Sequence, residues 1–358
     1  MPEKPQPRLY WIDALNILAC FAVVVLHCTT SVFINKGDFR WQCDVLLQSL
    51  FIFAVPVFFM ISGANLLGYR ARYDARTFFE KRLRKVAFTL VVASIIMYVA
   101  EPIIRQLLIG EPIAISLGGF ISGFLHNEIC NVYWFFYAII ILYAVTPIFS
   151  LIAQNKKVLG YAIALSIVTA MVFPLLERMS PDPSFLHLFI VPYLGSWLTY
   201  FLLGYYLVHH CTKRPSRGII IAVAIAMAVL MTALTLKTNQ PHTQSSGAFS
   251  PYDNFYTRAE SLFALVYATC LLLWFKSRNA SIEASPLYPL LRSMSGLSLG
   301  VYAIHMLVID TLDLIIPHTN LWDIGIRPFV VFALALALSW MGKRFMSAVR
   351  MFAGKRAR

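Results

Sequence analysis

Hydrophobic runs of about 20 residues recur along the whole 358-residue chain, and they limit its fold more than any other feature. A run of this length crosses the hydrocarbon core of a bilayer as an α-helix. Only helices and closed barrels satisfy their backbone polar groups in lipid, and the alternating pattern of barrel strands is missing. We therefore predict an all-α polytopic integral membrane protein. Its ten spans are predicted at 9–33, 45–69, 84–104, 132–153, 158–176, 191–209, 218–236, 257–275, 296–316 and 326–342.

Composition excludes the main soluble classes. The chain is 59% hydrophobic and 13% charged, whereas an average soluble domain has about 25% charged residues. This polarity is too low for a disordered chain, and six cysteines are too few for a disulfide scaffold. We expect one transmembrane domain over 1–358, with a basic cytoplasmic tail at 343–358. The first apolar run is too long for a signal peptide, so we expect no cleaved leader.

The net charge of +13 suggests an anionic partner, and its distribution predicts the topology. If the N-terminus is cytoplasmic, 23 of the 30 Lys and Arg residues fall on the inner side, giving +18 inside and −5 outside. This asymmetry follows the positive-inside rule, so both termini are predicted to be cytoplasmic. The positive charge is then explained by membrane orientation and by contact with anionic lipids or a phosphate-bearing ligand. We expect no nucleic-acid partner.

The first predicted helix contains Asp13, Asn16 and His27 among apolar residues. Ionisable groups inside a membrane are costly and are functional candidates by default. Asn16 and His27 are eleven residues apart, so they share a face to within about 20° and lie roughly 16 Å apart along the axis. The alternative is a polar stripe satisfied by neighbouring helices. Asp13 is expected near Arg8 or the basic loop after the second helix.

The second helix contains Pro56, which frees a backbone carbonyl, and Ser62-Gly63, which allows another backbone to approach closely. A basic cluster opens the third helix at Lys81, Arg82, Arg84 and Lys85. Such a cluster anchors anionic lipid headgroups or binds the phosphates of a nucleotide-containing donor, and the sequence leaves both open.

Helix 4 begins with an aromatic group that includes Trp134. In helix 9, Ser298, Tyr302 and His305 follow one another at spacings of four and three and share a face.

A disulfide between Cys43 and Cys130, both predicted on the outer side, is left open. The outer connection 105–131 is apolar enough to lie on or dip into the membrane. The connection 237–256 fits either a sugar- or peptide-contacting loop or a disordered connector.

Together these segments resemble a known family over essentially the full length. They are YWIDALNILACFAVVVLH, VPVFFMISG, the basic start of helix 3, YWFF, YFLLGYYL and LSLGVYAIHMLV. Their order resembles the acyltransferase-3 family of bacterial inner-membrane acyltransferases, and most closely the short branch typified by the enterobacterial common antigen O-acetyltransferase. The resemblance implies a ten-helix core and transfer of an acyl group, usually acetyl from acetyl-CoA, to hydroxyls of cell-envelope glycans.

The resemblance also assigns roles to residues. His27 matches an essential histidine, and the position of the arginine that precedes it in the family is occupied here by Asn16, which offers a dipole and no permanent charge. Arg82 and Arg84 match basic positions implicated in holding the CoA phosphates, and adjacent Lys85 is grouped with them. The expected substrate-binding residues are Trp134, Ser298, Tyr302 and His305. Helix 4 lacks the glutamate of larger members, which favours the short branch.

We therefore predict a membrane O-acyltransferase that uses acetyl-CoA and acts on an envelope glycan or lipid-linked sugar, with no metal. A neutral His27 would act as general base or accept the acetyl group transiently. Two alternatives stay open: a transporter or flippase, because buried histidines and proline-broken helices also suit a substrate path, and a non-catalytic homologue that binds envelope precursors.

Overall fold

The computed structural model describes residues 9–180, 195–212, 215–239 and 252–356, and every regular element in these ranges is a helix. The chain forms two compact units. The first comprises Met1–Leu26, Thr30–Ala75 and Val145–Ser295, and the second comprises His27–Thr29, Arg76–Ala144 and Gly296–Arg358. Helices α1 (Tyr10–Cys28) and α7 (Trp134–Ala153) contribute residues to both units.

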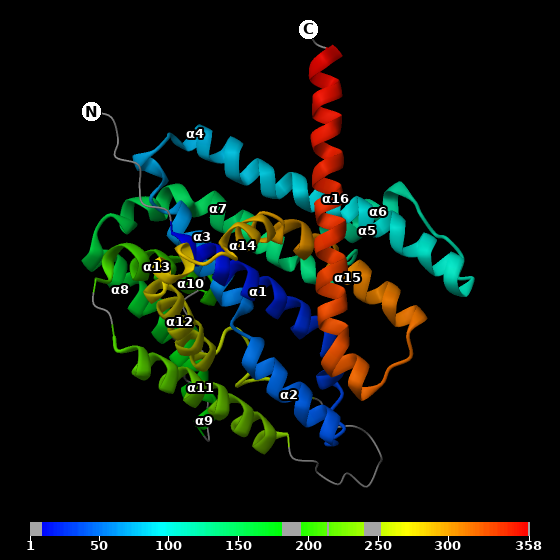
Figure 1. The fold of residues 1–358 in the computed structure, drawn as a ribbon. Coiled ribbons are helices and arrows are strands. Elements are labelled where there is room, and N and C mark those ends of the chain that lie inside the picture. Colours follow the sequence, from blue (N-terminus) through cyan, green and yellow to red (C-terminus); the bar gives the residue numbers. More distant parts are fainter. Residues whose placement is uncertain (1–8, 181–194, 213–214, 240–251, 357–358) are drawn as a thin grey trace. The chain divides into compact units, whose positions relative to one another are not determined.

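The first unit contains most of the shorter helices. They are α2 (Phe39–Phe51), α3 (Ala54–Leu66), α8 (Lys156–Ile167), α9 (Phe173–Met179), α10 (Ser196–Tyr205), α11 (Arg217–Thr238), α12 (Leu262–Ser277), α13 (Asn279–Glu283) and α14 (Tyr288–Ser295). Helices α11 and α12 lie side by side (Figure 1). Short 3₁₀ turns lie at Thr30–Phe33 and Tyr69–Ala71, and π-helical turns at Val168–Val172 and Tyr206–His210.

The break between α2 and α3 has its cause in Pro56. Because proline has no N–H, the carbonyl of Ile52 cannot receive its helical hydrogen bond, and the chain leaves α2 at Phe51 and enters α3 at Ala54. Beyond the break, α3 packs against α10 at two glycines. A Cβ on Gly63 would lie 1.7 Å from the carbonyl oxygen of Phe201, and one on Gly204 would lie 2.0 Å from that of Met60. The predicted close approach at Gly63 is confirmed.

The second unit is built on long helices. They are α5 (Arg84–Ile109), α15 (Ser298–Ile315) and α16 (Arg327–Arg356), with the short helices α4 (Ala75–Phe78) and α6 (Leu117–Leu125). A π-helical turn at Phe79–Leu83 joins α4 to α5, a 3₁₀ turn at Asn131–Tyr133 precedes α7, and a π-helical turn at Leu321–Ile326 precedes α16. Helix α15 packs against both α5 and α16 (Figure 1). Helix α16 continues to Arg356, so the predicted tail at 343–358 starts inside a helix.

The polytopic all-α prediction is confirmed, and eight of the ten predicted spans coincide with helical segments long and apolar enough to cross a membrane. They are Tyr10–Cys28, Phe39–Ala71, Ala75–Ile109, Asn131–Ala153, Lys156–Met179, Arg217–Thr238, Ser298–Ile315 and Leu321–Ala348. The span predicted at 257–275 corresponds to the shorter apolar helix α12. The span predicted at 191–209 corresponds to α10 and the π-helical turn after it, with 191–194 outside the described residues. The count of ten, the single domain and the side on which the termini lie stay predictions.

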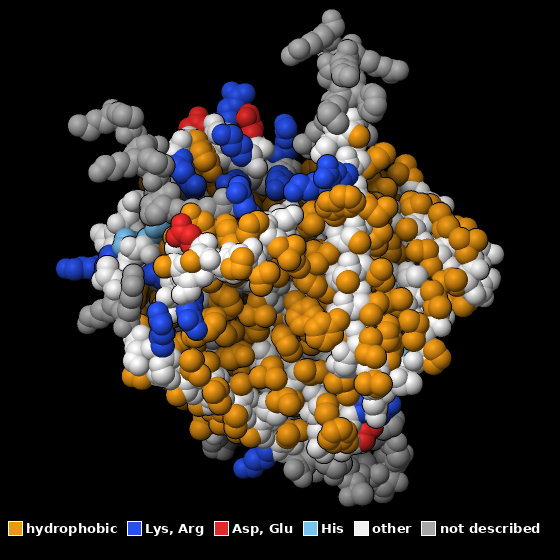
Figure 2. All heavy atoms as spheres, in the orientation of Figure 1, with side chains coloured by type: hydrophobic (Ala, Val, Ile, Leu, Met, Phe, Trp, Pro, Cys, Tyr) orange, Lys and Arg blue, Asp and Glu red, His pale blue; other side chains and the backbone are white. Residues whose placement is uncertain are grey.

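The exposed surfaces of both units suit lipid. Large apolar side chains are exposed on α5 and α16 in the second unit and on α11 in the first, where Ile221, Ile225 and Val229 follow a helical repeat. Figure 2 shows hydrophobic side chains covering most of the visible face, including the surface of α11. Such coverage is expected where the solvent is hydrocarbon. None of the six cysteines, all of which are among the described residues, forms a disulfide, so Cys43 and Cys130 are not joined.

Candidate active site

Two histidines predicted on separate helices lie next to each other in the second unit. His27 is near the end of α1 and His305 is in the middle of α15. Their ring centroids are 5.2 Å apart, with an angle of 41° between the ring planes. His305 is fully buried, and His27 is half-buried. Two imidazoles at this separation form a group that can accept, hold and pass on a proton.

The hydrogen bonds of His305 define which of its nitrogens is protonated. Nδ1 lies 2.8 Å from the carbonyl oxygen of Tyr302 and 3.2 Å from that of Val301. A carbonyl only accepts, so Nδ1 must donate and the neutral ring has its lone pair on Nε2. Nε2 is buried and has no hydrogen-bond partner among the described residues. It is therefore an acceptor available to His27 or to a substrate.

Aromatic residues hold α15 in place around this pair. The Tyr302 hydroxyl donates to the carbonyl of Val132, and its ring lies 5.1 Å from Phe135 and 5.2 Å from Phe136, between centroids. The Tyr133 hydroxyl donates to the carbonyl of Ala303 at 2.6 Å. These contacts hold α15 against the start of α7 and the turn before it. The Tyr302 hydroxyl donates its proton to a backbone carbonyl, so its role here is to position α15.

The other predicted substrate-binding residues are more distant from the pair. Trp134 is half-buried and packs edge-on against Phe135, with ring centroids 6.3 Å apart. Ser298 is the first residue of α15, about two turns before His305. The structure thus brings Tyr302, His305 and His27 together, places Trp134 one aromatic ring away, and sets Ser298 further along the same helix.

A buried arginine that no sequence motif marks lies against the end of the helix that contains His27. Arg327 opens α16 and is 4% exposed. Its Nη1 donates to the carbonyl of Cys28, the last residue of α1, at 3.3 Å, and its Nη2 donates to Asp313 of α15 at 2.5 Å. Asp323 lies 3.6 Å from Nη1 and also bonds His318. One guanidinium therefore ties together the two helices that contain the histidines. Burying a cation is costly, and here two carboxylates offset that cost. The sequence alone does not show that these carboxylates lie near Arg327.

Comparison with known proteins identifies the family. The acyltransferase-3 profile, described as an acyltransferase domain, matches residues 9–342. The chain belongs to the acyltransferase-3 family. Neither the curated proteins nor the solved structures give a match. The resemblance drawn from the sequence is confirmed at the level of the family, and this chain is a membrane acyltransferase.

In this acyltransferase, Asn16 has a structural partner. Its side-chain amide donates to the hydroxyl of Ser295 at 3.0 Å and to the backbone carbonyl of Ser295 at 3.3 Å, joining α1 to the end of α14 within the first unit. One turn earlier, Asp13 accepts a hydrogen bond from the Tyr288 hydroxyl at 2.7 Å, while Arg8, its predicted partner, lies outside the described residues. The polar residues at the start of α1 thus bind α14. A catalytic role for Asn16 stays a prediction.

The predicted donor-binding residues of the acyltransferase lie where α5 begins. Arg82 is the last but one residue of the π-helical turn, Arg84 opens α5, and Lys85 follows; all three are exposed. None of the three forms an ion pair with another described residue. Lys85 and Ala93, whose carbonyl lies 3.5 Å from the Tyr133 hydroxyl, are about 12 Å apart along α5. Three exposed cations that lie close together, with no ion pair to the described residues, fit a phosphate-bearing ligand.

A metal ion and a cysteine thiol are two other groups that can assist acyl transfer. In the ranges that the structure describes, no group of three or more His, Cys, Asp or Glu side chains could hold a metal ion. Cys130, just before the 3₁₀ turn that precedes α7, is 6% exposed, and burial raises the pKa of its thiol to about 12. It stays a protonated thiol near neutral pH, so it is a poor nucleophile. The histidine pair is the strongest candidate for the reacting group.

Proposed function

We propose that this protein transfers an acetyl group from cytoplasmic acetyl-CoA to a hydroxyl of a cell-envelope glycan or glycolipid in the bacterial inner membrane. The observation that supports the proposal is the pairing of His27 with His305 in a chain of the acyltransferase-3 family. An acyl transfer to an alcohol needs a base at the hydroxyl, and a buried imidazole is suited to that task near neutral pH.

In the proposed reaction His27 is the general base and His305 orients it. Nε2 of His305, which has no hydrogen-bond partner among the described residues, takes the N–H of His27 when the substrates bind, and the other nitrogen of His27 is then unprotonated and faces the acceptor. That nitrogen takes the hydroxyl proton as the oxygen attacks the thioester carbonyl. The tetrahedral intermediate collapses, the C–S bond breaks, and the CoA thiolate takes the proton back from His27. The products are the acetyl ester and free CoA.

The donor is proposed to bind through its phosphates at Arg82, Arg84 and Lys85. These residues fall on the predicted cytoplasmic side and have no ion-pair partner in the described part of the chain, so phosphate oxygens would be their first charged contacts. The pantetheine arm would then follow α5 towards α15. The absence of a glutamate in helix 4 supports the short branch of the family typified by the enterobacterial common antigen enzyme.

The first prediction tests the base. Purified protein in nanodiscs is given radiolabelled acetyl-CoA and an envelope-glycan extract, and both free CoA and labelled glycan are measured. We expect His27→Ala to lower kcat by about 100-fold or more, because general-base catalysis contributes roughly 10²- to 10⁴-fold. The matched control is His210→Ala, which removes an imidazole that is hydrogen-bonded to the carbonyl of Ala153 and packs on Tyr205 and Tyr206; this variant should retain activity.

Two substitutions of His305 show whether this residue orients His27 or only fills space. His305→Gln keeps a hydrogen-bond acceptor and should retain more activity than His305→Ala, with the difference in kcat and not in the KM for acetyl-CoA. Wild-type transfer rates in His27→Ala would remove His27 from the reaction. Release of no CoA by the wild-type protein with any glycan would overturn the acyltransferase activity proposed for this chain.

A further inference from the structure

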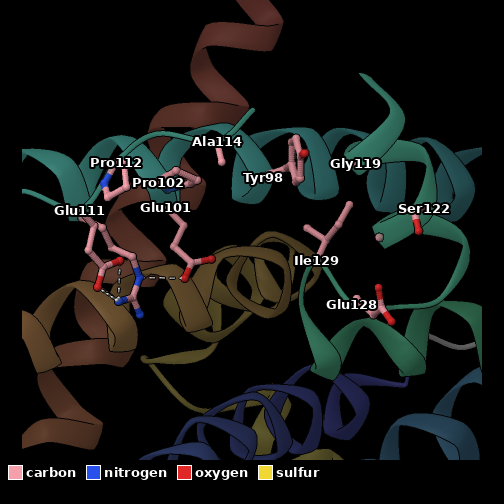
Figure 3. A pocket seen from close by; sticks show the side chains of 12 residues that line it. Tyr98, Glu101, Pro102, Glu111, Pro112, Ala114, Gly119, Ser122, Glu128 and Ile129 are labelled. Atoms are coloured by element: carbon pink, nitrogen blue, oxygen red, sulfur yellow. Dashed lines mark hydrogen bonds and ion pairs between the residues drawn. The ribbon is translucent and has the colours of Figure 1, made fainter. Parts of the chain in front are cut away.

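The second unit contains a cavity of about 530 Å³ beside the outer end of α5, away from the basic turn. Its walls come from three consecutive pieces of chain: the last turns of α5, the segment after Gly110, and α6 with the residues that follow it. Figure 3 shows Tyr98 and Ile129 in the middle of this pocket, with Glu101 and Glu111 to one side and Ser122 and Glu128 to the other. Pockets of this size accommodate small organic ligands. We call it the α5–α6 pocket.

The polar groups of the pocket are mostly acceptors. Arg105 donates to Glu101 at 3.1 Å and lies 3.5 Å from Glu111, which fixes one guanidinium between two carboxylates. Glu128 is exposed and forms no ion pair with any described residue. Three carboxylates and one guanidinium leave the lining net negative. Carboxylates only accept hydrogen bonds, so they pair with hydroxyl or amine donors and repel phosphate and carboxylate groups.

Two glycines of α6 allow close packing around the apolar part of the lining. The Tyr98 hydroxyl donates to the carbonyl of Ser116 at 3.2 Å, which fixes the ring against the start of α6. A Cβ on Gly119 would lie 2.5 Å from that hydroxyl oxygen, and one on Gly123 would lie 3.1 Å from Ile129. The aromatic ring of Tyr98 can pack against the C–H face of a sugar ring, and the neighbouring carboxylates can accept hydrogen bonds from the sugar hydroxyls.

The pocket and the histidine pair share their supporting segments. Glu128 and Ile129 lie just before Val132, whose carbonyl accepts the Tyr302 hydroxyl next to His305. On the other side, Asp310 of α15 interacts electrostatically with both Glu101 and Arg105. The chain before α7 therefore lines the pocket and also contacts Tyr302, and α15 interacts electrostatically with two residues of the pocket lining. This adjacency is what an acceptor site for the histidine pair requires.

We propose that the α5–α6 pocket binds the acceptor as a polyhydroxylated saccharide, and that its carboxylates select sugars that have no acid group on the ring they hold. The inference rests on the proposed acetyl transfer. Hydroxyls of the bound ring donate to Glu128 and to the second oxygen of Glu101, while the ring packs on Tyr98. A neighbouring hydroxyl of the same glycan is then directed towards His27.

The test uses two matched probes, methyl glucoside and methyl glucuronide, which differ by one carboxylate. We expect the wild-type protein to acetylate the glucoside with a KM at least tenfold lower than that for the glucuronide. Glu128→Gln should raise the KM for the glucoside about tenfold with kcat within twofold, because one charge-assisted hydrogen bond is lost. Glu128→Lys should reverse the preference between the probes. Glu283→Gln, an exposed acid on α13 of the first unit, is the control and should change neither value.

A binding measurement separates the two proposals. Calorimetric titration with each probe needs no turnover, so it reports on the pocket even if no acetyl transfer occurs. Glucoside binding that weakens about tenfold in Glu128→Gln supports the pocket; failure to release CoA in the transfer assay counts only against the proposed function. Equal affinity of wild type and Glu128→Gln for the glucoside, or no preference between the probes, would overturn the α5–α6 pocket as the saccharide site.

Discussion

At the scale of single residues, the site depends on contacts between side chains far apart in the chain. His27 and His305 both stand out in the sequence as ionisable groups inside apolar helices. Their 5.2 Å approach follows from helix packing, which no local pattern encodes. Arg327 is the opposite case, because nothing in its sequence surroundings marks it as buried. Its role becomes visible only through its bonds to Cys28 and Asp313.

Removing the Arg327 guanidinium should loosen both helices of the histidine pair. Arg327→Met leaves Asp313 and the buried Asp323 without the cation that they pair with. We therefore expect the free energy of unfolding to fall by about 3 kcal/mol and transfer activity to be lost. The measurement is denaturant unfolding in mild detergent together with CoA release. Arg327→Lys keeps the charge and should lose less. An unchanged unfolding midpoint for Arg327→Met would contradict the structural role of this arginine.

At the scale of helices, small residues determine which faces meet. Pro56 ends the hydrogen-bond ladder of α2, and Gly63 lets α3 lie against the backbone of α10 at Phe201. The sequence predicted a kink and a close approach at these positions. It did not identify α10 as the partner, nor Gly204 as the reciprocal contact, because the partner of a helix face depends on the packing of all the other helices.

Adding one methyl group at this crossing should be costly. Gly63→Ala places a Cβ 1.7 Å from the carbonyl oxygen of Phe201, so α3 and α10 must separate. We expect destabilisation of about 1–3 kcal/mol, the range for overpacked cores, measured as a lower thermal unfolding midpoint in detergent. The control is Gly342→Ala in α16, where nothing lies within 4 Å and alanine favours the helix. A stabilising Gly63→Ala would contradict the close contact.

At the scale of the whole molecule, hydropathy indicates which segments cross the membrane, and the distribution of charge predicts their orientation. Eight described helical segments are long and apolar enough to cross a membrane, and the basic residues gather in alternate connections along the sequence. In the predicted orientation, much of the net charge lies in the cytoplasmic connections. The exposed turn with Arg82, Arg84 and Lys85 is the one dense basic cluster to which we also assign a ligand.

The predicted orientation can be tested by cysteine labelling in a background without native cysteines. Ser216→Cys lies in a predicted inner connection and Thr319→Cys in a predicted outer one, and both positions are exposed. In intact spheroplasts, a membrane-impermeant maleimide should label Thr319→Cys at once and Ser216→Cys only after permeabilisation. Labelling of Ser216→Cys in intact spheroplasts would place the N-terminus on the outer side and reverse the assignment of donor and acceptor faces.

The sequence by itself determined the all-α membrane class, the approximate positions of eight membrane-crossing segments, the close approach at Gly63 and the family. These properties depend on local hydrophobicity, residue size and order along the chain. Tertiary structure alone decided that His27 faces His305, that Arg327 joins their helices, and that the segment before α7 borders the α5–α6 pocket. The physical reason is that in lipid no local pattern selects a helix's neighbours; van der Waals packing and the pairing of buried polar groups select them only when all helices are assembled.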